Sequence, residues 1–356
     1  MSPKTSSAPN LTRARTSTAE LAARSGSATP ARHANVPTAL DRAAQALMRR
    51  FRSRRPVRGG SLLITVFGDA IAPRGGIVTL GSLIRLAAPF GLTERLVRTS
   101  VGRLAQDGWL IARRDGRRSE YRLTPYGQQS FAQATRRIYA ANPSEWTGQW
   151  TLLLWPAPRV SNTAARRDRL RQELRWLGFG QIAAGLFLHP GCTAEQARGW
   201  LRDLEAPEEL VLLTSSSETP AADRRLVAAG WNLAELARRY RAFVEAFIPI
   251  QTALELSAVS KVRPVEPAGM PDHEVAFVIR TLLIHEYRRV HLQDPLLPLQ
   301  LLPDHWIGAS AYELCSSLYG RVFAAAEEYL SQTASTLREP LPAAGREAYT
   351  RFGGIR

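Results

Sequence analysis

The sequence has few cysteines and no long apolar run. Only two cysteines, Cys192 and Cys315, occur in 356 residues. They can form neither a disulfide framework nor a metal-ligand spacing, which is typical of a protein from a reducing compartment such as the cytoplasm. The longest apolar run near the start, Leu62 to Phe67, is far shorter than the about 20 residues that a membrane-spanning helix needs. These absences argue against a disulfide-stapled secreted protein and against a membrane protein.

Motifs of the common enzyme classes are missing as well. His285-Glu286 could begin a zinc-protease motif, but Arg289 stands where that motif needs its second histidine. The sequence has no nucleophile elbow, no phosphate-binding loop and no dinucleotide-binding fingerprint. Four histidines fall in one stretch at spacings that match no common metal signature: His273, His285, His291 and His305. The sequence therefore predicts a protein that is not an enzyme and has neither a metal site nor a cofactor.

Acidic residues are scarce in the first third of the chain. The net charge of +16 divides unevenly, because residues 1–58 hold 12 Lys and Arg against 2 acids and so contribute +10. Residues 59–125 hold 10 against 5 and contribute +5, whereas the remaining 231 residues hold 25 against 24 and contribute +1. A basic front end on a nearly neutral body indicates that a polyanion is bound at one end only.

The first 58 residues are predicted to be a disordered basic tail. Residues 1–39 are rich in Ser, Thr, Ala, Pro and Arg and have hardly any large apolar side chain, so they cannot offset the entropy of ordering. An organelle transit peptide has a similar composition and stays as an alternative. Asp41 to Phe51 could form a short helix that ends in a basic run. That run is either a solvated linker or an arm that touches phosphates.

Residues 59–127 follow the order of a winged helix-turn-helix. The pattern predicts a helix over 61–71, an extended piece over 77–80, a second helix over 82–89 and a third over 93–107. Two short strands, 109–113 and 120–124, follow around the turn-forming pair Asp115-Gly116. Helix, strand, helix, helix and hairpin in this order predict a DNA-binding domain.

The third of these helices carries the residues that suit a major groove. Its spacing puts polar side chains on one face, around the small Gly102, while apolar side chains lie on the other. Four arginines on the hairpin suit phosphate or minor-groove contacts. An arginine-rich surface helix without a ligand would look similar, but the hairpin charges favour nucleic-acid binding. The predicted DNA-binding residues are Thr93, Arg95, Arg98, Thr99, Arg103, Arg113, Arg114, Arg117 and Arg118.

The rest of the chain divides into a linking helix, an α/β region and a helical region. Residues 128–147 are expected to link, and strands alternate with helices over 148–220, which predicts a small ferredoxin-like domain. Apolar stripes at helical spacing over 221–335 predict a mostly helical regulatory domain, followed by a tail over 336–356. The predicted fold class is therefore α+β and multidomain.

Several stretches together resemble the PaaX family, which are repressors of bacterial phenylacetic-acid degradation operons. The resemblance covers roughly residues 60–335 in the right order. The stretches that carry it are Leu92–Val101 (LTERLVRTSV) with Gly108-Trp109-Leu110, Tyr121–Thr124, Trp146, Trp150, Trp231, Tyr240 with Phe243, His285–Arg289 (HEYRR), Asp294-Pro295, Leu297-Pro298, Leu301–Pro303 and Trp306 with Gly308. The family does not account for the long tail.

The resemblance implies a homodimeric repressor that binds a double-stranded DNA operator and is released by an acyl-CoA effector, typically phenylacetyl-CoA. Because that ligand carries phosphates, its site should offer guanidinium groups, and the helix that begins near Val275 has several. The predicted effector-binding residues are Arg280, His285, Arg288, Arg289 and Trp306. Alternatively, Arg288 or Arg289 pairs with Glu286 or Asp294 and only holds the helix to the turn that follows it.

Two other functions are weighed against the repressor. A ferredoxin-like middle domain resembles a small metal-dependent nuclease of CRISPR adaptation, but such an enzyme needs an Asp at the end of the first strand, where this chain has Leu154-Trp155-Pro156. A winged helix can also bind a protein partner instead of DNA. The placement of the arginines argues against that second alternative.

Overall fold

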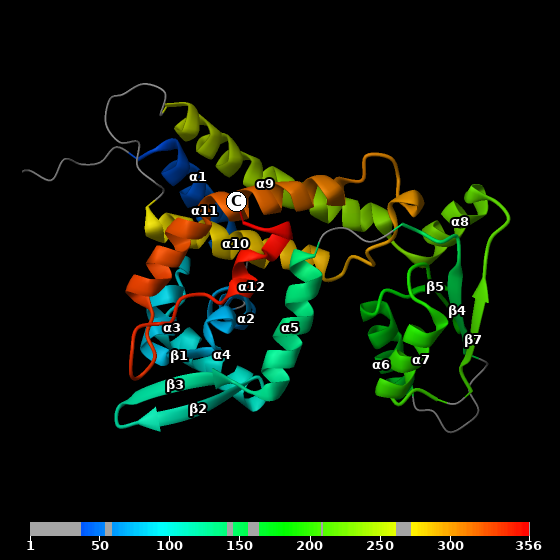
Figure 1. Cartoon of the computed structure of the whole chain (residues 1–356), viewed down its shortest axis with the longest axis horizontal. Coiled ribbons are helices and arrows are strands. Elements are labelled where there is room, and N and C mark those ends of the chain that lie inside the picture. The colour runs from blue at the N-terminus through cyan, green and yellow to red at the C-terminus, as the bar shows by residue number, and fades with distance from the viewer. Residues whose placement is uncertain are drawn as a thin grey trace, which may run out of the picture. The chain divides into compact units, whose positions relative to one another are not determined.

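The computed structural model describes residues 37–53, 59–140, 145–155, 164–207, 209–260 and 272–355. Residues 37–356 form one compact unit, which contains two antiparallel sheets and mostly helices otherwise (Figure 1). The predicted α+β class is confirmed. No helix among the described residues is both long enough and apolar enough to cross a membrane.

The first region, residues 59–123, is called the head below. Its sheet has the order β1-β3-β2, and β3 pairs antiparallel with both neighbours. The elements follow the predicted order, except that the first helix ends in a π-helical turn. In chain order they are α2 (Gly59–Val66), the π-turn η1 (Phe67–Ile71), the 3-10 turn η2 (Ala72–Arg74), β1 (Ile77–Thr79), α3 (Leu80–Ala87), the 3-10 turn η3 (Ala88–Phe90), α4 (Glu94–Gln106), β2 (Leu110–Asp115) and β3 (Arg118–Leu123).

Threonine caps fix where the helices of the head begin. The Thr79 hydroxyl accepts a hydrogen bond from the Ser82 amide at 3.3 Å, so α3 begins two residues before the predicted start at Ser82. Thr93 caps α4, because its hydroxyl accepts a hydrogen bond from the Leu96 amide at 3.3 Å. Such caps satisfy amide groups that the first turn of a helix leaves without partners.

The linking helix α5 (Pro125–Tyr139) follows β3 after a single residue, Thr124. Thr124 caps it by accepting from the Gly127 amide at 3.0 Å, and the Thr124 hydroxyl donates to the Gly108 carbonyl at 2.6 Å. A Cβ atom on Gly127 would lie 2.4 Å from the Trp109 carbonyl oxygen, so only glycine lets the helix approach this closely. The head and α5 are therefore one packed body.

The middle region has the strand order β5-β6-β4-β7, in which all neighbours are antiparallel. This is the order of a ferredoxin-like sheet, as the sequence predicted. The strand β5 was not predicted, because four residues with one large apolar side chain give almost no periodic signal. The elements are β4 (Trp150–Leu154), α6 (Ala164–Trp176), β5 (Gly180–Ala183), β6 (Leu186–His189), α7 (Ala194–Asp203) and β7 (Val211–Ser215).

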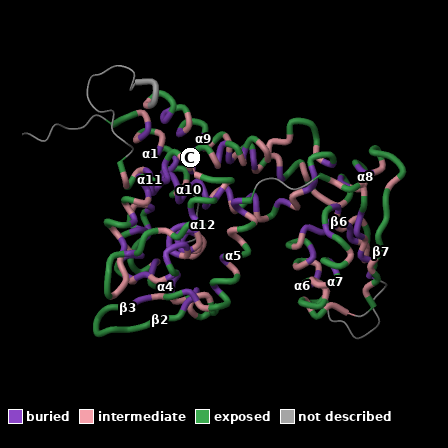
Figure 2. Tube along the Cα trace, viewed as in Figure 1, coloured by how far each residue is buried: buried purple, intermediate pink, exposed green. Residues whose placement is uncertain are grey.

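The third region is helical and shares the largest core cluster with the head, α1 and α5. The helix α10 is buried on nearly all sides, with Phe277, Ile279, Leu283 and Tyr287 almost inaccessible to solvent (Figure 2). It packs against α11 and α9. The helices are α8 (Pro220–Gly230), which the sequence did not predict, α9 (Leu233–Ser260), α10 (His273–His291) and α11 (Ile307–Thr333), with a 3-10 turn η4 (Leu299–Leu301) between the last two.

Part of the predicted N-terminal tail is folded. The helix α1 (Ala39–Ser53) packs on α9 and α10 and buries Leu40, Ala44, Leu47 and Met48 in the main core. Apolar residues at this spacing form one face of a helix, which explains the burial. The boundary of the tail at residue 58 is therefore too late, and residues 1–36 and 54–58 lie outside the described residues.

The predicted C-terminal tail also packs against the head. Residues 334–355, called the C-terminal strap below, include α12 (Arg346–Tyr349) and the 3-10 turn η5 (Arg351–Gly353). Their backbone bonds to the head at three places: Thr79 N–H donates to the Ser335 carbonyl at 3.0 Å, the Leu337 N–H donates to Glu120 at 2.9 Å, and the Gly345 N–H donates to the Pro73 carbonyl at 2.7 Å. The strap shows no periodicity, so the sequence gave no sign of this docking.

Candidate nucleic-acid interface

The helix α4 presents one buried and one exposed face. Val97, Val101 and Leu104 are buried against the rest of the head. On the opposite side all the predicted groove residues are exposed, namely Thr93, Arg95, Arg98, Thr99 and Arg103. A Cβ atom on Gly102 would meet nothing within 4 Å, so the centre of this face is open to a close approach. The arrangement is the one that a helix in a major groove requires.

Some of these polar side chains already have hydrogen-bond partners within the protein, and others do not. Arg98 donates to Glu94 one turn earlier through both Nε at 2.8 Å and Nη2 at 2.6 Å. The Thr99 hydroxyl donates to the Arg95 carbonyl at 2.9 Å. Among the described residues, the guanidinium groups of Arg95 and Arg103 have no hydrogen-bond or ion-pair partner. These two guanidinium groups are thus the ones free to pair with a base, whereas Arg98 must first leave Glu94.

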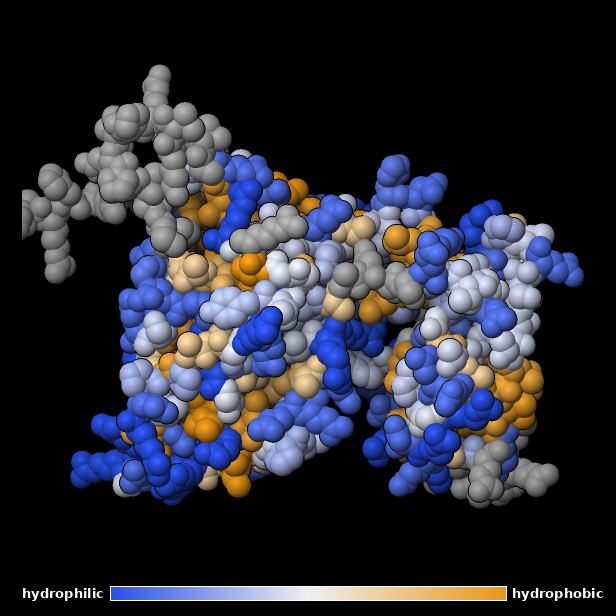
Figure 3. Space-filling model, in the orientation of Figure 1, coloured by the Kyte–Doolittle hydropathy of each residue, from blue (hydrophilic) through white to orange (hydrophobic). Residues whose placement is uncertain are grey.

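The hairpin of β2 and β3 forms the wing beside α4. The four predicted arginines Arg113, Arg114, Arg117 and Arg118 are all exposed, and hydrophilic side chains gather at this end of the molecule (Figure 3). Because neighbours along a strand point to opposite faces, Arg113 and Arg114 lie on different sides of the hairpin. The positive charge of the wing is therefore spread over both faces of the hairpin and is not gathered in one cluster.

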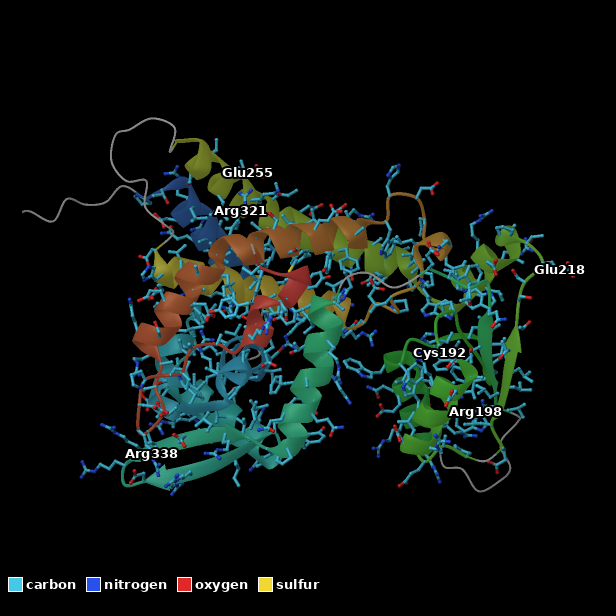
Figure 4. The ribbon with its side chains drawn as sticks, in the orientation of Figure 1. Cys192, Arg198, Glu218, Glu255, Arg321 and Arg338 are labelled. Carbon is cyan, nitrogen blue, oxygen red and sulfur yellow. The ribbon has the colours of Figure 1, made fainter. Side chains whose placement is uncertain are left out.

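The C-terminal strap adds a cation that the sequence did not suggest. Leu337 is bonded to Glu120 of β3, and this contact brings the exposed Arg338 next to the wing (Figure 4). Arg338 lies 215 residues or more beyond the wing in the sequence. Only the folded chain could show that it belongs to the same basic surface.

A buried carboxylate, Asp69, joins the head to the helical region and the strap. It lies on the π-turn after α2 and is 4% exposed. Its carboxylate accepts hydrogen bonds from Tyr139 at 2.7 Å and Tyr319 at 2.8 Å, and it forms ion pairs with Arg280 and Arg351, both at 2.8 Å. These four partners come from α5, α11, α10 and the strap. We call this group the Asp69 cluster.

Electrostatic balance keeps the Asp69 carboxylate charged. Burial alone would raise its pKa, but the charges of Arg280 and Arg351 and the two tyrosine hydroxyls outweigh burial, so the pKa lies below its ordinary value. Arg280 also pairs with Glu327, which in turn pairs with Arg74 of the head. Asp69 lies on a π-helical turn, a feature that often occurs at functional sites, and its cluster ties the head to the helical region and the strap.

Three family models match consecutive stretches of the chain. They are described as PaaX-like protein, which matches residues 58–127, PaaX protein central Cas2-like domain, which matches residues 143–227, and PaaX-like protein C-terminal domain, which matches residues 231–332. A curated protein, the transcriptional repressor PaaX of Escherichia coli (strain K12), is 37% identical over 303 residues, which are 84% of this chain and 92% of that protein. The chain belongs to the PaaX family.

Among solved structures, the uncharacterized protein Rv0674 from Mycobacterium tuberculosis is similar to this PaaX-family chain. It is 20% identical, the match covers 82% of this chain and 99% of that one, and the TM-score is 0.44.

The effector residues predicted for this PaaX-family chain do not come together in one open pocket. Arg280 is 1% exposed and belongs to the Asp69 cluster. His285 is buried, with its Nδ1 3.0 Å from the Thr65 hydroxyl. Arg288 donates to the same hydroxyl at 2.8 Å and to the Ser61 carbonyl at 2.6 Å. His285 and Arg288 fasten α10 to α2, and Arg280 fastens α10 to η1, so the donors of these side chains already have partners within the chain.

The two remaining predicted effector residues lie apart from these. Arg289 is exposed and lies 3.8 Å from Glu286, which corresponds to the alternative pairing that the sequence allowed. Trp306 is half-buried against Tyr240, with ring centroids 6.3 Å apart. Burial and then the nearby charge of Arg289 lower the pKa of Arg288 to about 10, so Arg288 stays protonated at neutral pH.

The nuclease alternative gains no support from the middle region. The strand β4 ends at Leu154 and is followed by the buried Trp155, so no carboxylate stands at its end. Across the part of the chain that the structure describes, no group of three or more His, Cys, Asp or Glu residues could hold a metal ion.

The sequence carried one overlooked sign of the Asp69 cluster. Asp69 is the single acid within the otherwise apolar run from Leu62 to Ile71. A lone acid on a buried face must find partners, because an unpaired buried charge is too costly. Its partners Tyr139, Arg280, Tyr319 and Arg351 lie 70 to 282 residues away, so the sequence could not name them.

Proposed function

We propose that this chain is a transcriptional repressor that reads duplex DNA with α4 and holds the backbone with the β2–β3 wing. The observation that carries the proposal is the exposed face of α4, on which the guanidinium groups of Arg95 and Arg103 have no partner among the described residues. Guanidinium groups pair with guanine O6 and N7 in the major groove, and wing arginines suit phosphates. A relative that is 37% identical over most of the chain is named as a repressor, which favours the same role.

A selection experiment tests the repressor function. Purified protein should enrich one family of sequences from a pool of random duplexes, and gel shifts should then show tight binding to the enriched site. Specific binding of this kind is typically 10³–10⁷ times tighter than binding to unrelated DNA at the same salt concentration. Binding that is equally weak on every duplex would contradict the proposal.

We propose further that an acyl-CoA such as phenylacetyl-CoA releases the repressor. Release requires that the ligand binds the DNA-incompetent state more tightly, since equal affinity for both states shifts nothing. The Asp69 cluster supports this coupling, because it ties the head to α10, α11 and the strap and so gives a change in the helical region a route to the head that carries α4. Adding phenylacetyl-CoA should weaken operator binding in the gel shift, whereas free phenylacetate should not. If both leave the shifted band unchanged, the repressor has a different signal.

We propose that the repressor acts as a homodimer on a two-fold operator, because one reading helix covers too few bases for tight specific binding. The surface that supports self-association is the open part of the middle sheet. There Leu154, Val211 and Leu213 are 38%, 43% and 47% exposed, and apolar side chains gather on this side of the region (Figure 3). The strands β4 and β7 carry no charged residue, which suits a two-fold contact where each residue lies near its own copy.

A charge placed on that surface tests the dimer. Leu213→Arg should convert a dimer into a monomer at micromolar concentration, as measured by light scattering, because the two-fold contact would bring two buried cations together. Leu256→Arg is the matched control, since Leu256 on α9 is 60% exposed and lies on another surface. A wild-type chain that is already monomeric would contradict the proposed homodimer. A dimer that is broken only by Leu256→Arg would contradict the proposed contact through the middle sheet.

A further inference from the structure

A small surface pocket between α1, α9 and α10 gathers arginines from all three helices. Its volume is about 210 Å³, and α1 packs along both other helices (Figure 1). Four of its nine lining residues are arginines and one is acidic. The charged lining residues are Arg50 from α1, Arg238 and Arg239 from α9, and Glu286 and Arg289 from α10.

The partners of these arginines leave positive charge facing the pocket. Arg50 donates one hydrogen bond, to the Ala242 carbonyl at 3.2 Å, and Arg239 donates to Gln293 and to the Arg289 carbonyl. None of these three acceptors carries a charge. Arg289 lies 3.8 Å from Glu286, which is too far for a hydrogen bond. A guanidinium has five N–H donors, so most donors of Arg50 and Arg289 have no protein acceptor among the described residues.

The arginines of this pocket have fewer carboxylates around them than the buried arginines of the Asp69 cluster. In the Asp69 cluster, Arg280 alone meets two carboxylates, those of Asp69 and Glu327. The pocket lining holds four guanidinium groups and one carboxylate, that of Glu286, and Arg238 also pairs with Glu235 outside the lining. Like charges this close repel each other, and an anion in the pocket would relieve that repulsion. Phosphate is the anion that best matches several guanidinium forks.

We propose that this pocket binds a phosphate group of a small phosphorylated ligand. The inference rests on the proposed release by an acyl-CoA, and it assigns the phosphate-bearing nucleotide end of that ligand to the pocket. The volume supports one end rather than the whole, because sites for drug-sized ligands measure about 300–1,000 Å³. Arg289, a predicted effector residue, thus lines a pocket together with three other arginines.

A bound phosphate would cross-link α1 to α9 and α10. Arg50 lies near the end of α1, three residues before the last residue of that helix, Ser53, and α10 is fastened to α2 of the head through Arg288. A ligand that draws these helices together would therefore act on the elements that support the head. This location fits a ligand that alters DNA binding without touching α4.

Calorimetry with adenosine 3′,5′-bisphosphate tests the site, because this probe carries the phosphates of the nucleotide end without the acyl group. The full-length wild-type chain should bind it, and Arg50→Gln and Arg289→Gln should each weaken binding about tenfold or more, since each removes charge-assisted hydrogen bonds. Arg241→Gln is the matched control and should bind like wild type, because Arg241 is an exposed arginine of α9 that does not line the pocket. Thermal unfolding should be nearly unchanged in all three variants.

The same variants separate failure of the site from failure of the function. If wild type does not bind the bisphosphate, or if Arg50→Gln and Arg289→Gln bind it as tightly as wild type, the site is overturned. Operator binding that persists and is still released by phenylacetyl-CoA would then leave the repressor proposal intact. If operator duplex displaces the bisphosphate and Arg50→Gln lowers affinity for DNA instead of nucleotide, the pocket binds DNA phosphates and the inference is wrong.

Discussion

Replacing Asp69 with alanine should lower the free energy of unfolding by about 3–5 kcal/mol, the range measured when one partner of a buried ion pair is removed. Arg280 and Arg351, which are 1% and 4% exposed, would then remain buried without their shared carboxylate. The hydroxyls of Tyr139 and Tyr319 would lose their acceptor as well. Urea unfolding followed by circular dichroism measures the change.

A surface ion pair provides the control for this substitution. Asp168→Ala removes the partner of Arg171 at 2.8 Å, but the two side chains are 72% and 38% exposed, so the expected loss is about 0.2–1 kcal/mol. A loss for Asp69→Ala as small as for Asp168→Ala would mean that the cluster does not hold the head to the body. Operator affinity should fall in parallel with stability, because the strap and α10 support the head through Asp69.

The same carboxylate makes the wild-type protein sensitive to acid. The pKa of Asp69 is lower in the folded chain than its ordinary value of 3.8, so its contribution to stability is fully present above that value. The contribution is lost as the pH falls below 3.8 and through the folded pKa, because the unfolded chain then binds a proton more readily. Comparing wild type with Asp69→Ala between neutral and acidic pH should show a difference that shrinks in acid.

Arg95→Ala and Arg103→Ala should each lower operator affinity by about 10- to 100-fold, since a bidentate contact to a base is worth about 1–3 kcal/mol. Each should also relax the preference at one base position per half-site. Wing substitutions such as Arg117→Ala should instead weaken binding to all sequences alike and make its salt dependence gentler. Gel shifts on the selected operator and on single-base variants of it, at two salt concentrations, distinguish the two patterns.

Two further variants sharpen this test. Arg225→Ala on α8 removes an exposed arginine far along the chain from the head and should not change operator affinity. Glu94→Gln removes the carboxylate that holds Arg98, so it should raise affinity for DNA of any sequence. If Arg95→Ala and Arg103→Ala bind the operator as wild type does, α4 is not the reading helix.

Local patterns in the sequence were sufficient for much of the fold. The concentration of positive charge before residue 126, the cap at Thr93 and the turn at Asp115-Gly116 all depend on neighbours in the chain. They predicted the order of elements in the head and the arginines that α4 and the wing expose. Short or aperiodic segments such as β5 and the C-terminal strap were missed because they bury few apolar side chains at regular spacing.

The tertiary structure decided which of the arginines can bind a ligand. The sequence alone gives Arg280, Arg289 and Arg95 the same chemistry, but a guanidinium is free only when no acceptor from elsewhere in the chain reaches it. Arg280 meets Asp69 from 211 residues away and is buried, whereas Arg289 comes to lie in a pocket with Arg50. Such encounters depend on how the helices pack, and a pattern of neighbours along the chain does not contain that information.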